Sequence, residues 1–409
     1  MFSYRYVEDD DIFEIEQGGS VIYYNDYTNK IAYDREKVLG HPHWKRPDQE
    51  GNHPRRIVLL PSNACNLACT YCFSQHDREK KEILDFDAIE KTLKTIVDEN
   101  PERELHVVFT GGGEPTVNPE FIKRCIGFFA SRKNISFSIT TNGCFPEDLR
   151  QIFIENDFSI AFSIDGDYGI EAGQQAVPLS EKKYNQAIEN ALAISKVCRR
   201  VSIVPVLTAE TVMEFAGREE ELVQRTVGYF FDRGFRAVGI TFDRDIFCRK
   251  PDVQLLDAIA DYCMELVRWK REHKDMFVKC RYIFTAPAYR YTARGICEGI
   301  TRFPDDLRIL PDGKLTFCNR IQDERFTYTT YSRNGLKRQM KSEVVRDMLD
   351  RMFERKTRCV QCIARQSCMT GICPAAIISN TDRELDNYCE NHMYLRKNLL
   401  ERYLGNEGR

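Results

Sequence analysis

The stretch that decides the fold is Ile57-Val58-Leu59-Leu60-Pro61-Ser62, closely followed by Cys65-Asn66-Leu67-Ala68-Cys69-Thr70-Tyr71-Cys72. The first segment is an apolar run with the length of a short buried strand. The cysteine loop follows the end of this strand, which is where α/β barrels place their reactive groups. The cysteine spacing suits three thiolates on one metal cluster and leaves a coordination position free. We therefore expect a reactive metal site in this loop.

The overall composition narrows the class of protein. The chain has 409 residues, 42% of them hydrophobic, which is enough for one large domain and a smaller one. A formal charge of -3 supplies no broad basic field, so we expect neither nucleic acid nor a membrane as a partner. The N-terminus lacks a signal-peptide core and no apolar run is long enough to span a membrane, which predicts a cytoplasmic protein. In that reducing compartment the 16 cysteines are expected to bind metal rather than form disulfides.

The order of the predicted elements indicates three segments. Residues 1–56 resemble a β-meander and form a β-rich extension. Residues 57–275 alternate strands with helices and predict a parallel sheet curved into a partial (βα)6 barrel. Residues 276–409 are rich in cysteine and poor in regular patterns, so we expect a second domain held together by metal. The expected strands lie near 57–62, 106–110, 135–141, 158–164, 201–207 and 237–242, and the expected helices near 86–98, 119–131, 147–155, 181–197, 211–232 and 253–272.

The cysteine triplet admits two simpler interpretations. It could be a structural zinc site that lacks its fourth ligand, or three buried cysteines that pack as small apolar residues. Structural zinc usually has four protein ligands, and no fourth is evident near Cys65, Cys69 and Cys72. An iron-sulfur cluster with one exposed iron fits the spacing better.

The triplet resembles the cluster motif of the radical SAM superfamily, in which three cysteines hold a 4Fe-4S cluster. Its free iron binds the amino and carboxylate groups of S-adenosylmethionine (SAM). A second motif, Thr110-Gly111-Gly112-Gly113-Glu114-Pro115, follows the second strand and resembles the family's Gly-Gly-Glu-Pro element. Gly112 and Gly113 would let the backbone approach the cofactor, and Glu114 would accept hydrogen bonds from its amino group. Alone, this motif could be an ordinary glycine-rich turn.

The third and fourth strands end in Thr140-Thr141-Asn142-Gly143 and Phe162-Ser163-Ile164-Asp165-Gly166, at the same barrel rim. By the same resemblance, Thr141 or Asn142 with Ser163 would bind the ribose hydroxyls of SAM. Its adenine would pack near Tyr71 and near Val206 or Leu207. Many relatives place a basic side chain after the fourth strand, against the cofactor carboxylate. Here that stretch is Gly169-Ile170-Glu171-Ala172-Gly173-Gln174-Gln175, so Lys182 or Lys183 is the substitute we expect.

A second set of cysteines resembles the SPASM domain, the auxiliary-cluster extension of sulfatase maturases and many peptide-modifying radical SAM enzymes. Relative to that pattern, the spacing between Cys368 and Cys373 is one residue longer. The resemblance implies two auxiliary 4Fe-4S clusters, and thus three in all. The fourth ligand of the second auxiliary cluster would be Cys280, the substrate or none, and a zinc ribbon is the alternative for the whole region. The two implied ligand sets are Cys359, Cys362, Cys368 and Cys389, and Cys297, Cys318 and Cys373.

The resemblance also implies the reaction. Such an enzyme cleaves SAM reductively to a 5'-deoxyadenosyl radical and abstracts hydrogen from a peptide or protein. The product would be an oxidised or crosslinked ribosomal peptide, joined by a carbon-carbon or thioether bond. Flavodoxin or ferredoxin would supply electrons. Residues 1–56 are too short for the winged-helix leader-binding domain of many peptide maturases, so leader recognition would need a separate leader-binding protein or another surface of this chain.

Two other functions remain open, and the proton acceptor is unassigned. A small-metabolite dehydrogenase or rearrangement enzyme is one, and a non-catalytic iron-sulfur carrier or zinc scaffold is the other. The Gly-Gly-Glu-Pro element disfavours the carrier, which needs no amino-acid-binding rim. Sulfatase maturases carry an aspartate beside the second auxiliary cysteine, but Asn319 follows Cys318 here and is a poor base. Asp243 and Asp245, after the sixth strand, are the candidates for proton transfer, with a solvated loop as the simpler interpretation.

Overall fold

A computed structural model describes residues 2–26, 30–39, 54–74, 81–99, 104–283, 306–318, 321, 324–332, 342–365, 368 and 373–407. Its first sheet is the predicted N-terminal meander, four antiparallel strands that follow one another in chain order. One strand, at the very start, was not predicted from the sequence. The strands are β1 (Ser3–Val7), β2 (Ile12–Gln17), β3 (Ser20–Asn25) and β4 (Lys30–Ala32).

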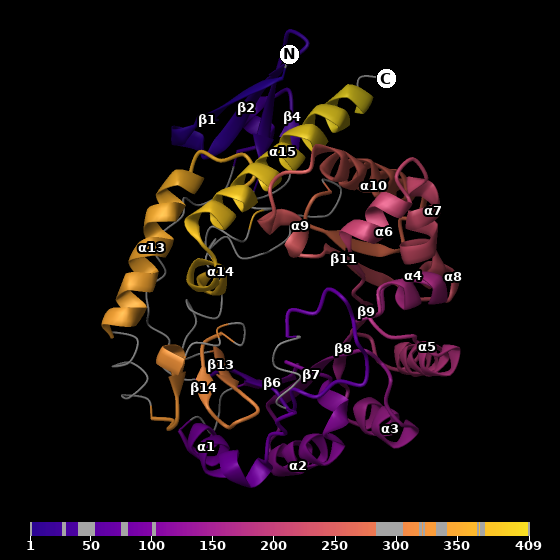
Figure 1. The fold of residues 1–409 in the computed structure, drawn as a ribbon, viewed down its shortest axis with the longest axis vertical. Coiled ribbons are helices and arrows are strands. Elements are labelled where there is room, and N and C mark those ends of the chain that lie inside the picture. The colour runs from indigo at the N-terminus through magenta and orange to yellow at the C-terminus, as the bar shows by residue number, and fades with distance from the viewer. Residues whose placement is uncertain are drawn as a thin grey trace.

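The second sheet is the predicted partial barrel. Its parallel strands run in the order β11, β9, β8, β7, β6, β5, each hydrogen-bonded to the next, so the α/β fold is confirmed. The bounds are β5 (Arg56–Leu59), β6 (Leu105–Phe109), β7 (Ile135–Thr141), β8 (Ser159–Phe162), β9 (Val201–Ile203), β10 (Val206–Leu207) and β11 (Ala237–Phe242). Figure 1 shows these strands on the inner side of a ring of helices.

Strands from beyond residue 275 extend this sheet at both edges. β12 (Phe277–Cys280) pairs with β11, and β13 (Asp306–Ile309) pairs in parallel with β5. β14 (Leu315–Thr316) and β15 (Thr327–Tyr328) then continue antiparallel. The sheet therefore runs across the expected domain boundary, and the division into three domains stays a prediction.

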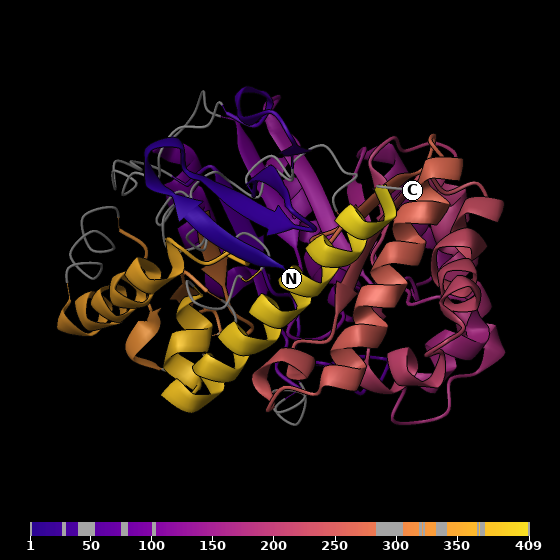
Figure 2. The ribbon, with the colours of Figure 1, turned by 90° about the horizontal axis from the view of Figure 1, so that it is seen from above.

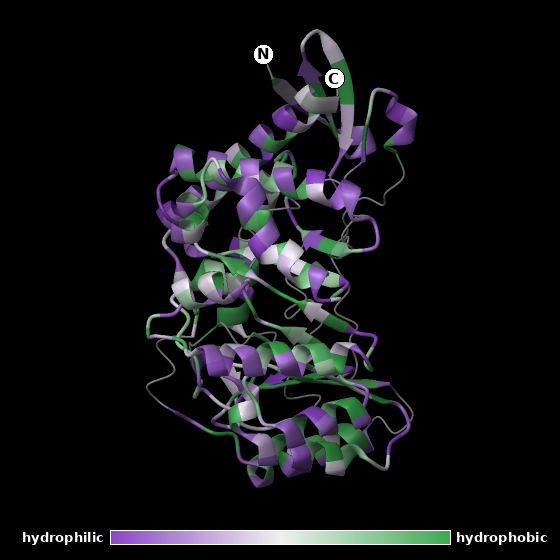
Figure 3. Ribbon diagram, turned by 90° about the vertical axis from the view of Figure 1, so that its right-hand side faces the viewer, coloured by the Kyte–Doolittle hydropathy of each residue, from purple (hydrophilic) through white to green (hydrophobic). Residues whose placement is uncertain are grey.

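The helices of the barrel lie between successive strands and cover the outer face of the sheet (Figure 1). Figure 3 shows apolar strands between helices whose outer faces are hydrophilic. In the described part of the chain, no helix is long and apolar enough to cross a membrane. The bounds are α1 (Phe86–Asp98), α2 (Pro119–Phe129), α3 (Glu147–Glu155), α4 (Tyr168–Gly173), α5 (Glu181–Ser195), α6 (Ala209–Glu214), α7 (Glu219–Val223), α8 (Tyr229–Asp232), α9 (Asp245–Cys248), α10 (Val253–Glu272), α13 (Glu343–Cys359), α14 (Pro374–Ser379) and α15 (Asp382–Glu407).

The single helix predicted over 211–232 is wrong. The chain forms α6, α7, a π-helical turn and α8 instead, because Gly217 has a left-handed backbone conformation (φ 79°) that ends the first of these helices. The strand predicted over 201–207 is likewise divided, with Pro205 between β9 and β10, since proline has no N–H to donate to a ladder. Helix α4, which the sequence analysis did not predict, follows β8.

The C-terminal helix α15 ties the rest of the chain to the barrel. It packs against α9 and α10, and its buried Asn391 donates to the carbonyls of Phe247 and Arg249. Figure 2 shows α15 crossing the molecule, with the N-terminal sheet and α13 on one side and the barrel helices on the other. The helix thereby brings C-terminal side chains to the rim of the barrel.

Candidate active site

A cavity of about 450 Å³ lies at the carboxyl ends of the barrel strands, which is within the size range of small-molecule sites. The cysteine loop forms one wall, and the ends of β6, β7, β8 and β11 form the rim. Residues from α14 and α15 close the opposite side. The lining includes Cys65, Cys69, Tyr71, Cys72, Gly112, Gly113, Glu114, Thr141, Asn142, Ser163, Val206, Asp243, Arg244, Cys373, Tyr388 and His392.

All three cysteines of the loop line this cavity and are partly buried. Two of the sulfurs accept N–H groups: Cys65 from the Leu67 backbone at 3.5 Å, and Cys69 from the Gln175 side chain at 3.3 Å. Burial raises the pKa of the Cys69 thiol to about 12, so it keeps its proton until a metal displaces it. Among the described residues, no three Cys, His or acidic side chains could hold a single metal ion. A cavity wall of three thiols with N–H donors fits the thiolate donor set of an iron-sulfur cluster.

The glycine motif packs directly against the start of the cysteine loop. A β-carbon on Gly112 would lie 2.5 Å from Asn63 Oδ1, and one on Gly113 would lie 2.0 Å from the Ala64 carbonyl oxygen. The Gly113 N–H donates to the Ser62 carbonyl at 3.0 Å. The loop backbone therefore excludes a side chain at Gly113, and a side chain at Gly112 would have to displace Asn63. The sequence analysis did not foresee this packing reason.

Glu114 lies at the centre of the rim. Its buried carboxylate accepts from the Thr116 backbone and hydroxyl through Oε1 (3.1 and 2.7 Å) and from the Thr141 hydroxyl through the same oxygen (2.6 Å). Oε2 accepts from the Asn142 N–H at 2.8 Å and has capacity for another donor. Burial raises the pKa of Glu114, and these hydrogen bonds oppose that rise. Glu114 thus organises the ends of β6 and β7 and keeps an acceptor position for an ammonium group.

The residues expected around ribose and adenine reach the cavity, with one exception. Thr141, Asn142, Ser163 and Tyr71 all line it. Leu207 does not, because it is fully buried within β10. Successive side chains of a strand point to opposite faces, so the neighbouring Val206 faces the cavity in its place. Of the two residues expected near the adenine, Val206 lines the cavity and Leu207 does not.

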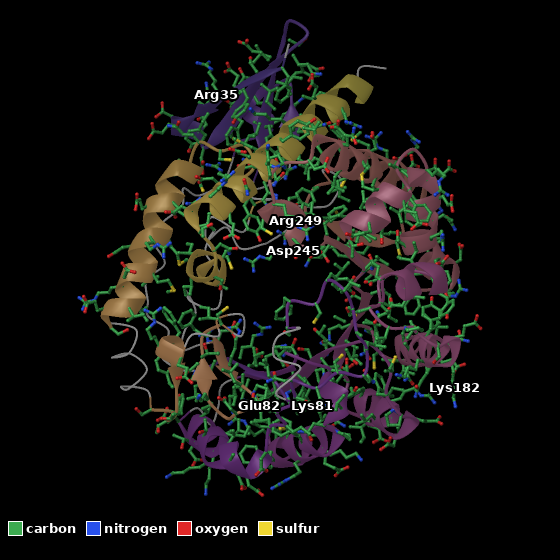
Figure 4. The ribbon with its side chains drawn as sticks, in the orientation of Figure 1. Arg35, Lys81, Glu82, Lys182, Asp245 and Arg249 are labelled. Atoms are coloured by element: carbon green, nitrogen blue, oxygen red, sulfur yellow. The ribbon has the colours of Figure 1, made fainter. Side chains whose placement is uncertain are left out.

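Neither lysine proposed as a basic substitute lines the cavity. Lys182 lies on the outer side of α5, as Figure 4 shows. Lys183 donates from Nζ to the Asn66 carbonyl at 3.2 Å and so contacts the back of the cysteine loop. Two arginines, Arg244 and Arg281, line the cavity instead, and Arg244 Nε donates to the Tyr388 hydroxyl at 2.7 Å.

A buried polar network beneath the cysteine loop was missed by the sequence analysis. Asp165 accepts from the Tyr71 hydroxyl (2.8 Å) and from Gln174 (2.5 Å), and its N–H donates to Glu171 (2.6 Å). Burial raises the pKa of Asp165 to about 6, and burial together with Asp165 raises the pKa of Glu171 well above its usual range. The available signal was the departure of residues 169–175 from the family pattern.

The two aspartates suggested for proton transfer differ in position. Asp243 lines the cavity, and burial raises its pKa. Asp245 is exposed, lies outside the lining and is 3.9 Å from Arg249; Figure 4 shows both side chains beside α9. The expectation that Asp245 faces the cavity is therefore wrong. The chain enters α9 at Asp245, and this turn places its side chain outside the cavity.

The described auxiliary cysteines lie on several elements. Cys359 ends α13, Cys362 follows in a tight turn, and Cys389 is on α15 close enough to act on the pKa of the Cys362 thiol. Cys373 lines the cavity, Cys318 is buried after β14, and Cys368 donates its N–H to the Ala364 carbonyl. Cys297 and Asn319 lie outside the described residues.

Cys280 does not suit the role of a fourth auxiliary ligand. It is fully buried in β12, where its thiol contacts the thiol of Cys263 on the core side of α10. The alternation of side chains along β12 turns Val278 and Cys280 into the core. The structure therefore removes Cys280 from the possible ligands of that cluster.

The fold and the cavity define an α/β partial barrel with a thiol-rich site at its carboxyl rim. Residues 59–217 match the family model described as the radical SAM superfamily, so this segment of the chain is similar to a radical SAM domain. Members of this family bind SAM and a 4Fe-4S cluster.

Among characterised proteins, the cysteine-type anaerobic sulfatase-maturating enzyme of Clostridium novyi (strain NT) is 31% identical over 164 residues, covering 38% of this chain and 44% of that one. The mycofactocin maturase MftC of Mycobacterium tuberculosis is 30% identical over 105 residues, covering 25% of each chain. The chain thus matches less than half of the length of these relatives.

A solved structure resembles a larger part of the chain. The structure described as native anSMEcpe with bound AdoMet and Cp18Cys peptide covers 87% of this chain and 100% of that one, with a TM-score of 0.65 at 18% identity. At this identity the likeness establishes a shared fold. It reaches beyond the segment that the family model matches.

Proposed function

We propose that this protein is a radical SAM enzyme with a C-terminal SPASM domain that modifies a peptide or protein. The observation that carries the proposal is the convergence of Cys65, Cys69 and Cys72 with the Glu114 rim on one cavity. The names of the sequence relatives, two of them maturases, support a peptide substrate. The fold shared with a peptide-bound maturase adds to that support.

The proposed roles follow the lining of the cavity. Cys65, Cys69 and Cys72 would hold the 4Fe-4S cluster. When bound, the cluster and SAM supply radical chemistry at carbon. Glu114 Oε2 would accept the amino group of SAM, while the glycine motif fixes the loop that carries the cysteines. The donor groups of Asn142 and Ser163 would take its ribose, and Tyr71 and Val206 would flank its adenine.

The auxiliary sites complete the proposal. Cys359, Cys362, Cys368 and Cys389 would hold one cluster, and Cys297, Cys318 and Cys373 another. Cys373 lines the same cavity as the cysteine loop, so a substrate placed there would lie between the two cysteine sites. A flavodoxin or ferredoxin would supply electrons, and a separate protein would present the leader of a ribosomal peptide for oxidation or crosslinking.

Asp243 is the proton acceptor we propose. Its carboxylate directly follows β11 and lines the cavity, and burial raises its pKa, which favours proton uptake. Asp243→Asn should retain iron and SAM cleavage but lower formation of the modified product at least tenfold with the physiological peptide. Product formation equal to wild type would rule Asp243 out.

The direct test of the function is anaerobic reconstitution followed by reduction with SAM present. The wild-type protein should form 5'-deoxyadenosine, measured by chromatography, and should hold about twelve irons for three 4Fe-4S clusters. The variant with Cys65, Cys69 and Cys72 replaced by alanine should form none and lose about four irons. Tightly bound zinc with little iron, or cleavage undiminished in the variant, would contradict the proposal.

A further inference from the structure

The most distinctive feature near the cysteine loop is the pair Gln174-Gln175, which follows the short helix α4 directly. The Thr70 N–H donates to the Gln174 carbonyl at 2.9 Å, and the Ala176 N–H donates to the Ala68 carbonyl at 2.7 Å. The segment therefore pairs with the cysteine loop as a short antiparallel ladder, with Cys69 opposite Gln175. The pairing fixes the backbone on both sides of one cysteine.

The two glutamine side chains contact different partners. Gln175 accepts the Ala68 N–H at 2.9 Å through its oxygen, while its Nε2 lies 3.3 Å from the Cys69 sulfur and 3.4 Å from Glu171. Gln174 is buried, and its side chain bonds to Asp165, to the backbone of β10 and to Thr208 and Thr211. One side chain thus contacts the cysteine thiol, and its neighbour secures the same segment from the other side.

We propose that Gln175 is a positioning residue of the radical SAM cluster, which sets the orientation of Cys69 and raises the reduction potential of that cluster through its N–H···S contact. This inference rests on the proposed function. An N–H donor stabilises the negative charge on a thiolate, and that charge is greatest in the reduced cluster. Hydrogen bonds to cluster sulfurs are accordingly among the factors that set iron-sulfur potentials.

The amide is well placed for this role. Glu171 accepts from Nε2 through Oε1 and from the Asp165 N–H through Oε2, so the donor is held from behind by a buried group. The Ala68 N–H holds the amide oxygen, which fixes the side chain at both ends. A donor secured at both ends requires little rearrangement when the metal cluster is reduced.

The test compares Gln175→Met with Gln174→Met. Methionine has a similar length to glutamine but no amide. Gln175→Met therefore removes the contact to the Cys69 sulfur, whereas Gln174→Met loosens the same segment and leaves that contact in place. Each protein is reconstituted anaerobically, and the EPR signal that responds to SAM is followed in a redox titration. Gln175→Met should shift the midpoint potential to more negative values, and Gln174→Met should leave it at the wild-type value. Gln151→Met, on the exposed face of α3, should change neither iron content nor potential.

The outcomes separate this inference from the proposed function. A wild-type protein without a SAM-responsive signal contradicts the proposed function. If the wild-type signal is normal but the midpoint potential is unchanged in Gln175→Met, only the role of Gln175 is overturned. The same holds if Gln174→Met shifts the midpoint potential as much as Gln175→Met does. If Gln175→Met fails to retain iron, wild-type protein labelled with ¹⁵N at the glutamine side-chain amide decides. A nitrogen coupling to the reduced cluster in pulsed EPR supports the contact, and its absence overturns it.

Discussion

The two cysteine regions of this molecule are held in place by different kinds of interaction. The loop at 65–72 is held by hydrogen bonds, including one from Lys183 to the Asn66 carbonyl, by close glycine packing and by a short backbone ladder with the segment after α4. The segment at 359–365 is held by charge: Arg365 pairs with Asp26 and Asp11 of the N-terminal sheet, at 2.7 Å each. Cysteine spacing identifies candidate ligands in both regions, but the residues that support them lie far away in sequence.

The charged anchor, formed by Arg365, Asp11 and Asp26, links the N-terminal sheet to the turn that carries two of the auxiliary cysteines. Arg365 is 9% exposed and the Asp26 side chain is fully buried, and Arg365 Nη1 also donates to the Val360 carbonyl between two cysteines. Burial raises the pKa of Asp26, and Arg365 opposes that rise. The N-terminal sheet therefore fixes the turn that carries Cys359 and Cys362.

The largest effect is expected when this anchor is broken. Arg365→Met should lower the free energy of unfolding by about 3–5 kcal/mol, because it removes the cation that pairs directly with both buried carboxylates. The measurement is urea unfolding of the reconstituted protein. The iron of the auxiliary sites should be lost before the SAM-responsive EPR signal.

The matched control is Arg35→Met, in the 3-10 turn that follows β4 of the same sheet. Arg35 pairs with Asp10 at the surface, where 47% of its side chain is exposed, and Figure 4 shows it on the outer side of the sheet. An exposed pair of this kind contributes about 1 kcal/mol or less. Equal losses in the two variants would show that the buried anchor has no special role.

A smaller effect is expected in the pH dependence of the free energy of unfolding, and it comes from the helix that carries Cys389. Helix α15 also carries His392, whose pKa is lowered to about 3 by burial and by Arg281 and Arg396. The unfolded chain takes up a proton near pH 6.5 and the folded chain does not, so this group's stabilisation is full above pH 6.5 and is lost as the pH falls toward 3. The loss is about 1.4 kcal/mol per pH unit over that window.

The test is urea unfolding at pH 7, 6 and 5. His392→Gln, which does not titrate, should lose less stability than the wild type between pH 6.5 and pH 5. Parallel losses in the two proteins would mean that His392 is protonated in the folded state as readily as in the unfolded chain.

Much of the barrel could be predicted because its signals are local. Helices α1, α3 and α10 begin and end where the apolar periodicity predicts; Asp85 caps α1 and Asp252 caps α10. The break at Gly217 and the parallel pairing of β13 with β5 were not predicted, since one depends on a single backbone conformation and the other joins residues 250 positions apart.

The candidate site shows the same division. Motif spacing predicted the cysteines and the glycine-rich rim that share the cavity. The choice between Val206 and Leu207 needed the strand register, and that between Asp243 and Asp245 needed the start of α9. The departure of residues 169–175 from the family pattern marked the Asp165–Glu171 region as unusual, but it did not show that folding buries both carboxylates.

The measurement that tests the central claim most directly is the EPR spectrum of the reduced wild-type protein before and after addition of SAM. We predict an iron-sulfur signal whose g values change when SAM binds, and the loss of that response when Cys65, Cys69 and Cys72 are replaced by alanine. A spectrum that SAM does not alter would contradict the assignment of this cavity.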